Sequence, residues 1–134
     1  MSKEVFTFIQ EFKPFYLATI KDLGPKVRPM GFAMEYHGKI YFGIGTHKQV
    51  YRQMVDNPLV EIAATGKDGD WLRLTGLAVF DDDPELYDSA VEVFPMLKEM
   101  YPADGPNKMG FYHLKDATAL FYDIKGEIKK TVKL

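Results

Sequence analysis

The sequence has 134 residues, and its 17 Lys and Arg side chains against 19 Asp and Glu give a formal net charge of −2. This length fits one domain, and a hydrophobic content of 46% is ordinary for a protein with a buried core. Disordered and collagen-like chains are thereby excluded, and we expect a single domain over residues 1–134.

Charge and cysteine content exclude several partners and chemistries. Nucleic-acid binding depends on a basic surface, so the slightly acidic balance argues against such a partner. The absence of Cys excludes a thiol nucleophile, a thiolate metal site and an iron–sulfur cluster, so redox chemistry would need a bound cofactor. The N-terminus shows no signal-peptide core and no apolar stretch is as long as a membrane span, so we expect a cytoplasmic protein with no membrane partner.

The first third of the chain reads as a helix followed by strands. Apolar residues at helical spacing predict a helix over residues 3–13, with Ser2 as its N-cap and Pro14 at its end. The sequence then becomes rich in β formers interrupted by turn residues. The strands predicted here are Phe15–Lys21, Val27–Tyr36 and Lys39–Gly45.

The rest of the chain adds two helices and further strands. Thr46 and Gln49 have the spacing of a capping box, which predicts a helix that opens at Thr46. Asp83 and Pro84 predict the start of another helix, whose inner face continues through Pro95 to Leu97. The strands predicted here are Leu59–Thr65, Trp71–Asp81, Phe111–Leu114 and Ala117–Ile124, before a turn at Gly126-Glu127 and a Lys-rich tail. Together they predict an α+β protein, a six- to seven-stranded antiparallel barrel with helices packed around it.

The clearest candidate binding site is the corner Gly43–Gln49, where a strand passes through two glycines into a helix. The first backbone N–H groups of a helix have no acceptor within it, and Thr46 and Lys48 add a hydroxyl donor and a positive charge. Such a corner suits a phosphate, with Gly45, Thr46, Lys48 and Gln49 as candidates. In the alternative interpretation the glycines only permit a tight turn and Thr46 only caps the helix.

A second candidate is Arg28-Pro29-Met30-Gly31 within a strand. Proline cannot donate to the sheet and glycine has no side chain, so a flat ligand could lie against the backbone here. Arg28 is a candidate anion anchor. Alternatively, a proline on an edge strand needs no ligand to explain it.

A third candidate is the face of the strand Trp71–Asp81 that carries Trp71, Arg73 and Thr75. An aromatic ring and a guanidinium on a face that does not point to the core suggest an interface. In the alternative interpretation Trp71 stacks on Arg73 on a half-solvated face. No pair of His residues has metal-ligand spacing and no Ser/His/Asp arrangement is visible, so we expect no metal site and no hydrolase, and no catalytic residue is assigned.

The order of these motifs resembles the FMN-binding split barrels of the pyridoxamine 5′-phosphate oxidase-like family, in particular the short nitroimidazole-resistance-like branch. The resemblance covers about residues 15 to 83 and, more weakly, 117 to 127. It is carried by these stretches: Phe15–Thr19, Arg28–Tyr36, Lys39–Phe42, Thr46–Met54, Asn57-Pro58 and Trp71–Asp82.

The resemblance implies a homodimer with FMN at the subunit interface. It implies that the flavin ring lies against Arg28–Gly31, and that the phosphate lies at the corner with Thr46 and Lys48. Trp71 and Arg73 would be interface residues that reach the partner's flavin. We expect an oxidoreductase that uses FMN to transfer electrons or hydride between a reduced donor and a small acceptor, such as a nitro-aromatic or pyridoxine-like compound.

Two alternatives keep the fold. The protein could bind flavin without a dedicated substrate, as an electron shuttle, flavin buffer or redox-responsive module. The discriminating feature is a pocket beside the ring, for which Tyr51, Trp71 and the loop 101–110 are candidates. The fold could also hold a deazaflavin or haem, in which case His113 would have to serve as an axial ligand.

Overall fold

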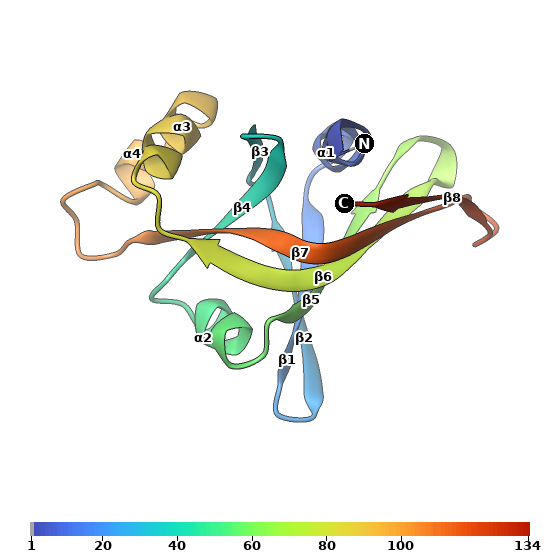
Figure 1. Cartoon of the computed structure of the whole chain (residues 1–134), viewed down its shortest axis with the longest axis horizontal. Coiled ribbons are helices and arrows are strands. Elements are labelled where there is room, and N and C mark those ends of the chain that lie inside the picture. The colour runs from blue at the N-terminus through green and yellow to red at the C-terminus, as the bar shows by residue number, and fades with distance from the viewer. Residues whose placement is uncertain (1) are drawn as a thin grey trace.

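The computed structural model describes residues 2–134, which form one antiparallel sheet and four α-helices (Figure 1). The helices are α1 (Ser2–Glu11), α2 (Gln49–Asp56), α3 (Glu85–Val93) and α4 (Leu97–Met100), with a 3-10 turn η1 (Lys67–Gly69). The strands are β1 (Phe15–Lys21), β2 (Gly24–Met30), β3 (Ala33–Tyr36), β4 (Lys39–Gly45), β5 (Leu59–Thr65), β6 (Trp71–Asp81), β7 (Met109–Tyr122) and β8 (Ile128–Lys133). The predicted α+β class is confirmed. Within the described residues no helix is long and apolar enough to cross a membrane.

The sheet is a barrel that does not close. Its strands follow the order β2-β1-β5-β6-β7-β4-β3, and β8 pairs with β7. The two outer strands, β2 and β3, follow each other in the chain and are joined by Gly31 and Phe32. The open seam therefore lies at this link. The prediction of one strand over Val27–Tyr36 was wrong. This segment forms parts of two strands, because the chain crosses here from one edge of the sheet to the other.

Helices α1 and α2 pack against the barrel and contribute side chains to its core. In Figure 1 they lie on opposite sides of the band formed by β6 and β7. Val5 and Ile9 of α1 and Met54 of α2 are buried in the same core as the inward-facing side chains of the strands. The outer face of β1, β2 and β5 is left without a helix, and Tyr16 and Val27 remain 43% and 69% exposed there.

The helical segment after β6 differs from its prediction at both ends. Pro84 is the N-cap of α3, one residue after the predicted Asp83, whose Oδ1 accepts a hydrogen bond from the N–H of Glu85 at 3.0 Å. The helix ends at Val93 because Pro95 lacks the N–H that a continued helix needs, and α4 begins after it. The predicted N-cap of α1, the side chain of Ser2, lies outside the described side chains.

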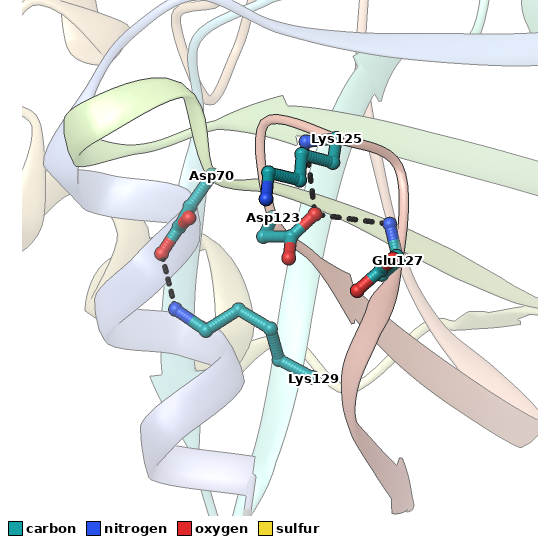
Figure 2. A network of polar contacts seen from close by, with 5 residues as sticks. All are labelled: Asp70, Asp123, Lys125, Glu127 and Lys129. Carbon is teal, nitrogen blue, oxygen red and sulfur yellow. Dashed lines mark hydrogen bonds and ion pairs between the residues drawn. The ribbon is translucent and has the colours of Figure 1, made fainter.

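The C-terminal segment is a strand and not a tail. Asp123 organises the preceding turn, because its Oδ1 accepts hydrogen bonds from the backbone N–H groups of Lys125 (2.9 Å) and Glu127 (3.0 Å), as Figure 2 shows. Lys129 Nζ then reaches Asp70 Oδ2 at 2.7 Å. The tail prediction was wrong because all but one of the side chains of β8 are exposed, which hides the strand pattern. The described sheet therefore has eight strands, not six or seven.

Candidate functional site

A cleft of about 650 Å³ opens at the seam of the barrel, and we call it the seam cleft. It lies between the end of β2, the link to β3, the end of β4 and the break between α3 and α4. Six of the ten residues predicted to bind a cofactor line it: Arg28, Pro29, Met30, Gly31, Gly45 and Lys48. The fold thus brings together two motifs that are separated in the sequence.

The seam cleft is positively charged. Lys13, Arg28 and Lys48 line it, and its lining residues include no Asp or Glu. Lys13 Nζ donates a hydrogen bond to the carbonyl of Gly31 at 2.5 Å, and burial lowers the pKa of this lysine. Three cations without a carboxylate favour an anionic or electron-rich ligand.

Arg28 is held in a fixed orientation by neutral oxygens. Its Nη1 donates to Thr19 Oγ1 at 2.7 Å, and its Nη2 donates to Gln53 Oε1 at 2.8 Å. Thr19 Oγ1 also donates to Gln53 Oε1 at 2.6 Å, and these two side chains are only 1% and 7% exposed. Burial lowers the pKa of Arg28, and no carboxylate in the described chain pairs with it. Its charge is therefore oriented but not neutralised.

A second hollow of about 570 Å³ adjoins the seam cleft through Lys48, which lines both, and we call it the cationic hollow. Its basic side chains come from Lys21, Lys48 and Arg52, while Asp22 and Asp56 oppose them. Predicted residues Thr46 and Gln49 also line this hollow.

The capping box predicted at Thr46 is wrong. Lys48 is the N-cap of α2, without a side-chain hydrogen bond, and the helix begins at Gln49. The backbone N–H and the hydroxyl of Thr46 both donate to the carbonyl of Lys108, at 2.9 and 3.1 Å. Thr46 therefore fastens the corner to the start of β7, a long-range role that local spacing cannot reveal.

The glycines of β4 allow neighbouring side chains to approach its backbone closely. A Cβ at Gly45 would lie 2.5 Å from Tyr101 Oη, and a Cβ at Gly43 would lie 2.5 Å from Met109 Cε. A Cβ at Gly31, by contrast, would meet no atom within 4 Å. The glycines of β4 thus let the 101–109 segment pack against the seam cleft, whereas Gly31 leaves open space.

Trp71 and Arg73 lie outside both hollows, on the outer face of the barrel. Trp71 stacks on Tyr122 with ring centroids 4.2 Å apart, and the guanidinium of Arg73 lies 5.1 Å from the Trp71 centroid. Arg73 Nε also pairs with Glu61 Oε1 at 2.7 Å. The expected stacking of Trp71 with Arg73 is therefore present. Contact with a flavin stays a prediction, because it would involve a second subunit.

Sequence reasoning missed two walls of the seam cleft. Gln10, from α1, has an amide oxygen that is buried without a hydrogen-bond partner in the described chain. The opposite wall is apolar and comes from the break between α3 and α4: Val93, Phe94, Leu97 and Met100. The available signal in the sequence was the apolar run around Pro95, which helical spacing assigns to the core.

Some of the other residues predicted to line a pocket beside the flavin ring lie in the seam cleft, and others do not. Tyr101 and Met109 of the loop 101–110 line the seam cleft, whereas Tyr51 packs against the ring of Phe80, 4.8 Å between centroids. His113, considered as a haem ligand, contacts the ring of Tyr41 and lines neither hollow. Among residues 2–134 no three His, Asp or Glu side chains gather where they could hold a metal ion.

Comparison with known proteins identifies the family. The model of the pyridoxamine 5′-phosphate oxidase family matches residues 1–120. The chain belongs to this family. A NimC/NimA family protein from Clostridium acetobutylicum is 36% identical, with a TM-score of 0.90 over 99% of this chain and 93% of that one.

More distant structures share the fold alone. A heme binding protein from Mycobacterium smegmatis is 14% identical, with a TM-score of 0.73 over 98% of this chain and 57% of that one. A FAD-binding protein from Mesorhizobium loti is 16% identical, with a TM-score of 0.60 over 89% of this chain and 93% of that one. No match is found among curated proteins.

Proposed function

We propose that this member of the family is an FMN-dependent oxidoreductase that holds the flavin ring in the seam cleft and the phosphate in the cationic hollow. The observation that carries the proposal is the junction of the two hollows at Lys48. A flavin mononucleotide needs one flat site and one phosphate site at a short distance, and a phosphate dianion favours the cationic side chains of the second hollow. The FAD-binding protein from Mesorhizobium loti supports a flavin on this fold and nothing finer.

The side chains of the seam cleft fit the flavin ring. Arg28 and Lys13 supply donors and positive charge, and Gly31 leaves open space beside the backbone of the seam. Bound FMN would supply the electron chemistry, while the positive charge of Arg28 would stabilise the anionic reduced form and raise the reduction potential.

The proposal includes a homodimer formed through the outer face of the sheet. Trp71, Tyr16 and Val27 leave aromatic and apolar surface on that face, where no helix covers the strands. Exposed apolar surface of this kind is typical of an interface between subunits. A Trp71→Ala variant should therefore weaken dimerisation, which sedimentation velocity measures, while a fully monomeric native protein would contradict this part of the proposal.

The acceptor would enter beside the wall formed by Val93, Phe94 and Met100. This wall is apolar, and the cations of the cleft oppose a positively charged ligand. We therefore propose a small aromatic acceptor that is neutral or anionic. If the reduced protein does not bind such acceptors in the cleft, the alternative of an electron shuttle without a dedicated substrate is favoured instead.

The test is the visible absorption spectrum of the purified protein, followed by titration with FMN and with riboflavin. We expect flavin bands, or saturable quenching of flavin fluorescence at one FMN per subunit. Lys48→Gln should weaken FMN binding about tenfold more than riboflavin binding, because Lys48 lines both hollows but only FMN carries the phosphate. Lys67→Gln, an exposed lysine that lines neither hollow, is the matched control.

The outcomes separate the candidates. No binding of either flavin contradicts the proposal, and a haem absorption band would replace FMN with haem. Equal weakening of FMN and riboflavin by Lys48→Gln would place the phosphate elsewhere.

A further inference from the structure

The strand β7 changes partners halfway along one of its edges. On that edge β4 pairs with β7 from Met109 to Tyr112, and β8 pairs with it from Thr118 to Tyr122. On the other edge β6 follows almost the whole strand. Within the described sheet, residues 113–116 therefore pair with no strand on the first edge, and we call this gap the notch.

A β-bulge lies opposite the notch, in the pairing of β7 with β6. Between Thr75 and Leu77 the register shifts, so that β7 has one residue more than β6, and Asp116 adopts a positive φ of 53°. A Cβ at Gly76 would lie 3.0 Å from Leu114 Cβ, so a residue without a side chain lets the two strands stay close here. Bulges bend a strand and increase its local twist, so β7 changes direction between the segment that pairs with β4 and the segment that pairs with β8.

The notch opens into a cavity of about 440 Å³ with an apolar floor. Ile40, Phe42 and Leu74, which form this floor, belong to the barrel core, and Leu114 completes it. Binding of an apolar group to such side chains is favourable, because it removes apolar surface from water.

The rim of the notch is cationic. Lys39, Lys115 and Lys133 reach it from three different strands, and none of them forms an ion pair with a described residue. Asp116 is the one acidic side chain among the lining residues. Burial, and next the charge of Lys39, lower the pKa of the remaining polar side chain, His113. Three unpaired ammonium groups around an apolar floor suit a ligand with one anionic end.

We propose that the notch binds a small amphipathic carboxylic acid, with its aromatic or aliphatic body on the apolar floor and its carboxylate among the three lysines. The site shares no lining residue with the seam cleft. It therefore goes beyond the proposed flavin function and does not depend on it.

The test is isothermal titration calorimetry with 2-naphthoate on the protein as purified. The matched ligand is 2-naphthalenemethanol, which has the same apolar body and no charge. We expect one 2-naphthoate site per subunit and at least about tenfold weaker binding of the alcohol, because a charge-assisted contact is lost. The triple substitution of Lys39, Lys115 and Lys133 by Gln should weaken 2-naphthoate binding to the level of the alcohol, while Lys13→Gln, in the seam cleft, should not.

The NMR signals of the three histidines locate the ligand. His113 lines the notch and His47 lines the cationic hollow, so each reports on one site. Bound 2-naphthoate should shift the ring signals of His113 and raise its pKa, because it brings a negative charge close to the imidazole. Absence of binding, a shift confined to His47, or binding that the triple variant leaves unchanged would each overturn the proposal.

Discussion

Replacement of Thr19 by valine tests the network that orients Arg28. The Thr19 hydroxyl donates to Gln53 Oε1 at 2.6 Å and accepts from Arg28 Nη1 at 2.7 Å. Valine has nearly the same shape and favours strands as threonine does, so the substitution removes the two hydrogen bonds and little else. We expect the variant to fold and to be less stable.

The magnitude follows from what remains of the network. Gln53 Oε1 keeps its bond from Arg28 Nη2 at 2.8 Å, and Arg28 Nη1 keeps the carbonyls of Leu17 at 3.3 Å and Lys26 at 3.2 Å. Neither group therefore loses every partner, although the remaining contacts of Nη1 are long. A buried hydrogen bond to a charged group contributes about 1.5 to 3 kcal/mol, and the remaining contacts reduce the loss to about 1 to 2 kcal/mol.

Urea unfolding of the flavin-free protein measures this loss. The midpoint should fall while the slope m stays unchanged, since the surface exposed on unfolding is the same. Thr75→Val is the matched control, because its hydroxyl lies 3.5 Å from Glu61 Oε1 on the half-buried outer face and should contribute no more than about 0.5 kcal/mol. Equal effects of the two substitutions would refute the reasoning.

Three further predictions concern packing, pH and ligand linkage. Gly45→Ala should destabilise by about 1 to 3 kcal/mol in urea unfolding, because its Cβ would lie 2.5 Å from Tyr101 Oη, whereas Gly31→Ala should be nearly neutral. Burial, and next a hydrogen bond to Asp81, raise the pKa of Tyr41 to about 12. Its contribution is therefore complete below pH of about 10 and lost as the pH rises toward 12, so Tyr41→Phe should flatten the stability profile in that range. FMN at 100 times its Kd should raise the unfolding free energy by about 2.7 kcal/mol in the same assay.

The strands that the sequence predicts correctly are those whose signals are local. Phe15–Lys21, Lys39–Gly45, Leu59–Thr65 and Trp71–Asp81 have the predicted bounds. In each case β formers are bounded by residues that favour turns. One such turn residue is Asp22, after the first of these strands. It adopts a left-handed φ of 54°, which Asp tolerates better than most residues.

The errors occur where distant contacts decide the structure. Phe111–Leu114 and Ala117–Ile124 are predicted as two strands, and they form one strand that ends at Tyr122, because β7 pairs with β6 on both sides of the bulge at Asp116. Thr46 has a capping sequence but bonds to Lys108 instead. Neither the pairing of β7 with β6 nor the bond from Thr46 to Lys108 can be predicted from the spacing of neighbouring residues.

The candidate site shows the same division. Arg28, Gly31 and Lys48 could be selected from the sequence because Pro, Gly and basic residues interrupt strand patterns. Gln10 and Phe94 could not be selected in this way. Helical periodicity assigns such residues to a surface or to a core, but it does not show which end of a helix lies beside the seam cleft. Knowledge of strand order was required, and strand order is a tertiary property.

The edge strand β2 of the open barrel is protected against pairing with other chains. Successive residues of a strand direct their N–H groups to alternate sides, so Pro25, Val27 and Pro29 share the side that does not face β1. The two prolines remove two of these three donors, and Lys26 adds charge beside them. At the other end of the strand order, β3 is only four residues long. Intermolecular β-sheet growth, the usual hazard of unpaired edges, is thereby discouraged at the two strands that border the open seam.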